Sequence, residues 1–153
     1  MIIRHFSDIK AWQAARSLVR EIYALSSGNA LERDFGLRDQ LRRSAVSVMS
    51  NIAEGFGRGS DRDFVRFLDI AQGSANEVQS LLFTIFDLGY ADMDQIRSAQ
   101  QATERALALI RAFRSYLTTS MTREPTSEYD HVLFDGGPST EDGEPASEKS
   151  SDD

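Results

Sequence analysis

The sequence has no cysteine, and only two of its 153 residues are histidine. Without cysteine there are no disulfides and no thiolate metal sites, which favours a reducing compartment. His5 and His131 offer no paired metal ligands. No segment approaches the roughly 20 consecutive apolar residues of a transmembrane helix. The N-terminus also lacks the apolar run of a signal peptide, so the sequence predicts a cytoplasmic protein with no membrane segment.

Sequence motifs typical of enzymes are scarce as well. The glycine-rich segment Gly55–Ser60 follows a predicted helix and lacks the Gly-Lys-Ser/Thr ending of a phosphate-binding loop. Glu54 and Glu77 could pair as carboxylates, but the Glu-x-x-His motifs of metal sites in helical bundles are absent. The sequence therefore predicts no enzyme, no metal site and no bound cofactor.

The net charge of −7 is unevenly distributed along the chain. Up to Arg123 there are 16 basic and 14 acidic residues, which gives +2. From Glu124 onward there are one lysine and 10 acidic residues, which gives −9. The low isoelectric point therefore comes mostly from the C-terminal part of the chain.

Periodicity and composition predict an all-α protein. A hydrophobic content of 41% suits a single core in a chain of this length. The first of four predicted helices runs from about Ser7 to Ser26, with Ser7 as its N-cap. The second begins near Gly36 or Leu37 and ends in a group of glycines that starts at Gly55.

The third and fourth helices have clear start and stop signals. Ser60–Asp63 resembles a capping box that opens the third helix, Gly89 suits the position after its end, and Asp92 would cap the fourth helix. The apolar positions of the fourth helix alternate steps of three and four, which favours long, nearly antiparallel helices. They are Ile96, Ala99, Thr103, Ala106, Ile110, Phe113 and Leu117. With short connections, this predicts an up-down antiparallel four-helix bundle over residues 6–121.

Residues 122–153 are rich in Ser, Glu, Asp, Gly and Pro, which predicts a disordered acidic tail. One apolar group interrupts this composition. It consists of Tyr129, Val132, Leu133 and Phe134. This group is either residual hydrophobicity in a disordered segment, or a short docking motif that orders on a partner or folds back on the bundle.

The second helix has an unusually wide apolar face, an arc of about 160° compared with the about 100° that one core needs. Its residues are Leu41, Ala45, Val46, Val48, Met49, Ile52 and Ala53. We therefore expect this helix to contact something outside its own bundle, most simply a second copy of the chain.

The opposite face of the second helix is a continuous polar stripe, and antiparallel pairing places Ser74 and Glu77 of the third helix beside its start. Amides and hydroxyls predominate in this stripe, which suits a hydrogen-bonded network. Its members would be Gln40, Arg43, Ser47, Asn51, Glu54, Ser74 and Glu77. The network either fixes the register of the two helices or forms a ligand site.

The segment Gln40–Arg58 contains the pattern Ser-x-x-x-Asn-Ile-Ala-Glu-Gly at Ser47–Gly55. Together with Asp63–Glu77 and Phe6–Gln13, it resembles a family of small four-helix-bundle proteins. The family includes proteins encoded in intervening sequences of bacterial large-subunit ribosomal RNA and the accessory variability determinants of diversity-generating retroelements. The resemblance implies a ring-like homopentamer. In the retroelement branch it also implies a basic surface that binds nucleic acid and a partner reverse transcriptase.

This chain departs from the strongly basic retroelement proteins, because its body is only +2 and its tail is −9. The arginines at helical spacing are nevertheless candidates for phosphate contacts, since guanidinium groups bind phosphate in a bidentate manner. They are Arg38, Arg42, Arg58, Arg62 and Arg66. Aspartates lie nearby, so ordinary solvated faces with salt bridges are the alternative interpretation.

Two functional hypotheses follow from these patterns. In the first, a homo-oligomeric, non-enzymatic bundle binds RNA or DNA, a nucleic-acid-processing protein, or both, and the acidic tail weakens non-specific binding. In the second, the protein is an interaction scaffold that does not bind nucleic acid. Its docking sites would then be Tyr129–Phe134 or the outer faces of the bundle.

Overall fold

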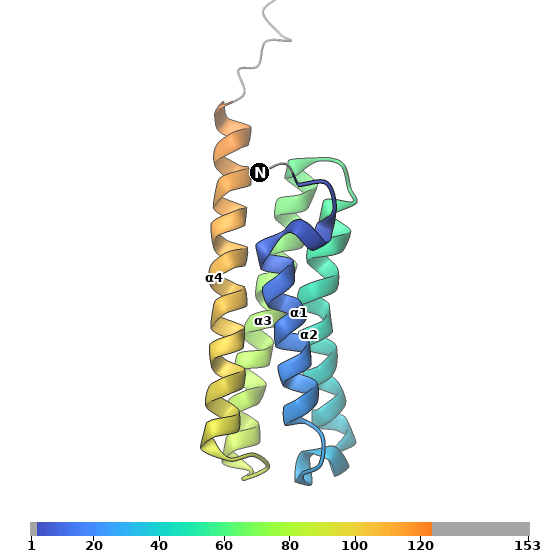
Figure 1. Cartoon of the computed structure of the whole chain (residues 1–153), viewed down its shortest axis with the longest axis vertical. Helices are drawn as coiled ribbons and strands as arrows, with labels where there is room; N and C mark the ends of the chain where they lie inside the picture. Colours follow the sequence, from blue (N-terminus) through green and yellow to red (C-terminus); the bar gives the residue numbers. More distant parts are fainter. Residues whose placement is uncertain (1–2, 124–153) are drawn as a thin grey trace, which may run out of the picture. The chain divides into compact units, whose positions relative to one another are not determined.

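A computed structural model describes residues 3–123. The last helix continues to Arg123, two residues into the predicted tail, and the rest of that tail, with its apolar group at Tyr129–Phe134, lies outside the described residues. The described part of the chain is all-helical and contains no strand. Its helices are α1 (Lys10–Leu25), α2 (Phe35–Phe56), α3 (Asp61–Asp87) and α4 (Met93–Arg123). They lie side by side in alternating directions, which confirms the predicted four-helix bundle (Figure 1).

The start of the first helix differs from the prediction, and Ser7 is not its N-cap. Phe6–Asp8 forms a separate 3-10 turn, η1, which His5 caps by accepting a hydrogen bond from the Ser7 N–H at 3.3 Å. The Asp8 carboxylate turns back and accepts from the His5 N–H at 3.0 Å. Because these contacts close the turn on itself, α1 begins only at Lys10, after the extended residue Ile9.

The core is formed by apolar side chains from all four helices. Of the seven residues in the predicted α4 seam, six are buried, and the half-buried Phe113 packs against Phe64 with ring centroids 5.2 Å apart. The one polar residue of the seam, Thr103, is buried because its hydroxyl donates to the Ala99 carbonyl at 2.7 Å. Among the described helices, none has the length and apolarity that crossing a membrane requires.

The predicted caps of α3 and α4 are present. Ser60 accepts a hydrogen bond from the Asp63 N–H at 3.2 Å, and Asp92 accepts from the Gln95 N–H at 2.8 Å. Gly89 has φ of +67°, and Tyr90, the next residue, donates its N–H to the Ile85 carbonyl at 3.1 Å. This arrangement is a Schellman motif, which ends α3 and turns the chain into α4.

A second 3-10 turn, η2 (Ala30–Arg33), connects α1 to α2. It was not predicted from the sequence. After it, Asp34 caps α2 by accepting from the Leu37 N–H at 3.1 Å, and it also accepts a hydrogen bond from the Tyr90 hydroxyl at 3.3 Å. The start of α2 is therefore linked to the α3–α4 turn at the same end of the bundle (Figure 1).

Candidate nucleic-acid interface

The five candidate arginines do not form one surface. Arg38 and Arg42 lie near the start of α2, whereas Arg58 follows its last residue and Arg62 and Arg66 lie in the first turns of α3. A helix rises about 1.5 Å per residue, so Arg38 and Arg58 are about 30 Å apart along α2. The structure places the two groups at opposite ends of the bundle (Figure 1). We call the end with Arg58, Arg62 and Arg66 the α2–α3 end, because it contains the α2–α3 connection, and the other the opposite end.

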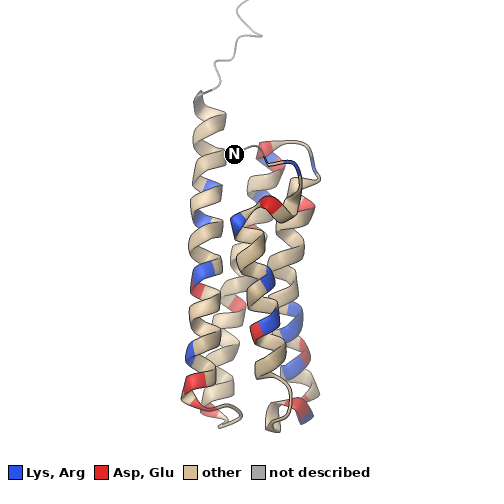
Figure 2. Cartoon of the chain, in the orientation of Figure 1, with Lys and Arg blue, Asp and Glu red and all other residues tan. Residues whose placement is uncertain are grey.

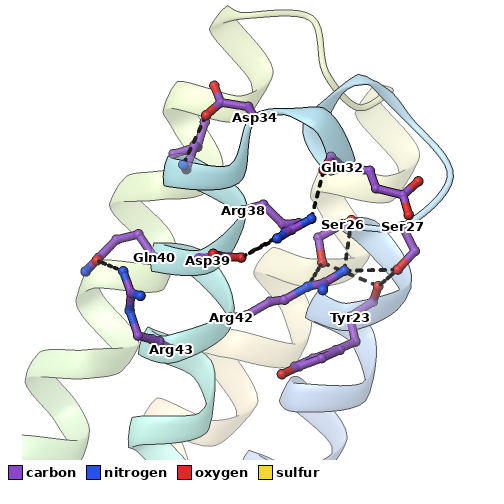
Figure 3. Close-up of polar contacts among 11 residues, drawn as sticks. Tyr23, Ser26, Ser27, Glu32, Asp34, Arg38, Asp39, Gln40, Arg42 and Arg43 are labelled. Atoms are coloured by element: carbon purple, nitrogen blue, oxygen red, sulfur yellow. Dashed lines mark hydrogen bonds and ion pairs between the residues drawn. The ribbon is translucent and has the colours of Figure 1, made fainter.

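Arg42 is bound into the end of α1 (Figure 3). Its Nε donates to the Ser26 hydroxyl at 2.7 Å, and its Nη2 donates to the Ser26 carbonyl at 3.0 Å and the Ser27 hydroxyl at 3.1 Å. The guanidinium also lies over the Tyr23 ring, 4.6 Å from its centroid. Since the last carbonyls of a helix have no partner within the helix, Arg42 fills a structural need at the α1 C-terminus.

Arg38 is engaged in a similar way (Figure 3). Its Nη2 lies 2.8 Å from an Asp39 carboxylate oxygen, and its Nη1 donates to the Glu32 carbonyl at 3.0 Å. The guanidinium lies 4.9 Å from the centroid of the Phe35 ring. The side chain is 21% exposed, so most of its surface is covered and its charge is offset by Asp39.

At the α2–α3 end, the arginines are more exposed. Arg58 forms an ion pair with Glu54 at 2.5 Å, but its side chain is still 51% exposed. Arg66 lies 3.8 Å from Asp63 and is 78% exposed. Arg62 is exposed and makes no ion pair with any residue that the structure describes. Ion pairs between such exposed groups contribute little, so these guanidiniums remain available to a phosphate.

The two ends also differ in their balance of charge (Figure 2). The α2–α3 half comprises residues 3–16, 49–72 and 105–122, and the opposite half comprises 17–48 and 73–104. In the α2–α3 half, nine basic residues (Arg4, Lys10, Arg16, Arg58, Arg62, Arg66, Arg105, Arg111, Arg114) face five acidic ones (Asp8, Glu54, Asp61, Asp63, Asp69). In the opposite half, six basic residues (Arg20, Arg33, Arg38, Arg42, Arg43, Arg97) face nine acidic ones (Glu21, Glu32, Asp34, Asp39, Glu77, Asp87, Asp92, Asp94, Glu104).

Several basic residues at the α2–α3 end were not among the sequence-based candidates. Arg4 and Lys10 lie near the start of the sequence and Arg105 and Arg111 lie in α4, and only the fold brings the two pairs to one half of the molecule. Arg114 is there too, but its Nε donates to Asp69 at 2.5 Å. The hydrogen bond and the charge of Asp69 raise the pKa of the Arg114 guanidinium.

The predicted polar network consists of two separate groups of contacts between α2 and α3. In the first, Gln40 donates from its amide to the Glu77 carboxylate and accepts from Arg43 Nη2 at 3.2 Å. The contact between Gln40 and Glu77 is one that the antiparallel arrangement predicted. Glu54 takes part in neither group, because its carboxylate binds Arg58.

The second group lies nearer the middle of the helices, so Ser74 is not beside the start of α2 as predicted but opposite Ser47. The hydroxyls of Ser47 and Ser74 are 2.8 Å apart and join α2 to α3. Asn51 donates to the Ser47 carbonyl at 2.8 Å and to the Ser47 hydroxyl at 3.0 Å. A role of these contacts in fixing the helix register stays a prediction.

Comparison with known proteins concerns both sequence and fold. Residues 7–112 match the family described as 23S rRNA-intervening sequence protein. No curated protein matches the sequence. The fold is similar to that of a solved protein of unknown function from the S23 ribosomal protein family of Bacteroides thetaiotaomicron. The two are 23% identical with a TM-score of 0.63, over 69% of this chain and 95% of the other.

Proposed function

Because this chain belongs to the 23S rRNA-intervening sequence protein family, we propose that it is a homo-oligomeric accessory protein that binds nucleic acid through the α2–α3 end of its bundle. The observation that carries this proposal is the positive charge of the α2–α3 half, which has nine basic and five acidic residues. Two of the basic residues, Arg62 and Arg66, are exposed. Phosphate contacts of this kind supply affinity that does not depend on base sequence.

The fold itself does not account for the exposed arginines. Arg62 and Arg66 are four residues apart, so they lie about 6 Å apart along one side of α3. The acidic residues beside them do have a structural role. Asp61 and Asp63 lie in the first turn of α3, where negative charge stabilises the helix N-terminus, and the Asp63 carboxylate also accepts from the Ser60 hydroxyl.

Arg38 and Arg42 have a different role in this proposal. Their guanidiniums donate to protein carbonyls and hydroxyls at the α1–α2 connection, so Arg42 joins α2 to the end of α1 and Arg38 joins α2 to the η2 turn. We assign the phosphate contacts to Arg58, Arg62 and Arg66, and a structural role to Arg38 and Arg42.

The test is a binding titration of duplex DNA and of structured RNA at several salt concentrations. We expect the affinity of the full chain to fall steeply with salt, because each phosphate contact releases counterions. Replacing Arg62→Gln and Arg66→Gln together should lower the slope of log affinity against log salt by about 1.8 for duplex DNA. The matched control is Arg20→Gln with Arg33→Gln, an equal charge change at exposed positions of the opposite half.

Two outcomes would contradict the proposal. The first is an affinity that stays constant from low to high salt, and the second is an equal loss of slope in the Arg62/Arg66 variant and the Arg20/Arg33 control.

A version that ends at Arg123 is also informative, since its net charge is +2 instead of −7. We expect it to bind more tightly. If neither form binds, the interaction-scaffold hypothesis is favoured.

Self-association is the second part of the proposal. On α2, Val46, Met49 and Ala53 are only half-buried in the single chain, and this apolar flank is available to another copy. Assembly would place several α2–α3 ends in one particle and raise avidity for a long polyanion. Sedimentation velocity tests this directly. The family resemblance implies a pentamer, and a monomer at micromolar concentration would contradict this part.

A further inference from the structure

Exposed apolar side chains gather at the α3–α4 corner, which we define as residues 83–94. Of the large hydrophobic side chains exposed in the described chain, four lie in these twelve positions. They are Phe83 (62% exposed), Phe86 (42%), Leu88 (51%) and Met93 (48%). Exposed apolar groups that gather in this way are typical of interaction surfaces, whereas single ones are ordinary.

These side chains are not needed for the core of the bundle. The buried stripe of α3 ends with Leu82 and Ile85, and both are completely covered. Phe83 and Phe86 lie one turn apart on α3 and outside that stripe. Met93, the first residue of α4, follows directly after the turn. Leaving such side chains in water forfeits roughly 25 cal/mol for every Å² of apolar surface that could be buried.

The same corner is acidic. Asp87, Asp92 and Asp94 are exposed, and the Asp94 side chain is 95% exposed. Residues 70–104 contain five acidic residues and one basic residue, Arg97, which lies 3.8 Å from Asp94. A polyanion is therefore repelled from this corner, whereas a cationic partner is attracted.

The corner is also held in one conformation. The Schellman motif at Gly89 fixes the turn, the Asp92–Gln95 capping box fixes the start of α4, and the Tyr90 hydroxyl bonds to Asp34. A surface that is already ordered loses little conformational entropy when a partner binds.

We propose that the α3–α4 corner is a docking surface for a basic segment of a partner protein that carries apolar anchor residues. Phe83, Phe86 and Met93 supply the apolar contact, and Asp87, Asp92 and Asp94 supply the complementary charge. Proteins that act on nucleic acid commonly carry such segments, because the same positive charge neutralises phosphates. This inference does not depend on nucleic-acid binding at the α2–α3 end, which lies at the other end of the molecule.

The probe is a short synthetic peptide of alternating arginine and leucine with one tryptophan, titrated into the nitrogen-15-labelled full chain. We expect chemical-shift changes centred on residues 83–97. Replacing Phe83→Gln with Phe86→Gln should weaken binding at least about tenfold, since buried aromatic anchors carry most of the energy of such contacts. The matched control, Ile70→Gln with Tyr116→Gln, removes two comparably exposed apolar residues from the α2–α3 half and should leave the affinity unchanged.

A second variant, Asp87→Asn with Asp94→Asn, keeps the apolar anchors and tests the charge; it should bind more weakly and with less salt dependence. Three results would overturn the inference. One is equal weakening in the phenylalanine variant and its control. Another is a set of shift changes confined to residues 124–153. The third is a loss of self-association in the Phe83/Phe86 variant, which would identify a second copy as the occupant.

Discussion

Gly55 determines how closely α2 and α3 approach each other at the α2–α3 end. A Cβ atom at this position would lie 2.6 Å from a ring carbon of Phe64 and 2.7 Å from the Cβ of Phe67. Real contacts are not this short, so any larger residue forces the two helices apart. The glycine that ends the Ser47–Gly55 pattern therefore has a packing role, in addition to marking the end of a helix.

Gly55→Ala should lower the free energy of unfolding by about 1–2 kcal/mol. Alanine favours the helix by up to about 1 kcal/mol, but overpacking costs about 1–3 kcal/mol. Gly73→Ala is the matched control, because it also lies within a helix and a Cβ there meets nothing within 4 Å. We expect that variant to be about 0.5–1 kcal/mol more stable. Urea unfolding measures both, and equal stabilisation would show that the contacts at Gly55 relax freely.

Single residues also show the limit of prediction from the sequence. The helical spacing of Arg38 and Arg42 does not reveal that both guanidiniums bind the α1–α2 connection. Periodicity carries no information about this connection, because the η2 turn has no apolar repeat. The pair Ser26–Ser27 after the first helix was the available signal, since hydroxyls beside a helix end can accept from an arginine.

At the scale of elements, most of the bundle could be predicted. Caps at Ser60 and Asp92 and the stop at Gly89 are local signals, and the α4 seam is a regular repeat, so each follows from neighbouring residues. The first helix was predicted to begin at Ser7 because serine is a common N-cap. The helix instead begins at Lys10, because the Asp8 carboxylate accepts a hydrogen bond from the His5 N–H and closes a separate turn before it.

The contact between the Ser47 and Ser74 hydroxyls should couple α2 to α3. A double-mutant cycle with Ser47→Ala and Ser74→Ala is expected to give a coupling energy of about 0.5–1.5 kcal/mol, the net value of one hydrogen bond. In the control cycle, Ser50→Ala replaces Ser47→Ala. The Ser50 hydroxyl donates to the Val46 carbonyl of its own helix, so no coupling to Ser74 is expected. Similar coupling energies in both cycles would contradict a specific interaction between Ser47 and Ser74.

For the whole molecule, the distribution of charge determines electrostatic interaction with partners more than the net charge does. The described body is close to neutral, yet its two ends have opposite excesses of charge and are separated by about 30 Å along α2. At physiological ionic strength, charges are screened over about 8 Å, so each end acts as a separate electrostatic surface. Composition alone cannot show this separation, because it depends on which helix ends meet in the fold.

The length of α4 has a consequence for hydrogen exchange. Its last buried residue is Leu117, and in the single chain the helix continues past the ends of its neighbours (Figure 1). We expect the backbone amides of Thr118–Thr122 to exchange with solvent far faster than those near Ile110, which open only when the bundle unfolds. Mass spectrometry of deuterated peptides would show the difference. Slow exchange up to Thr122 would mean that another copy of the protein covers this part of α4.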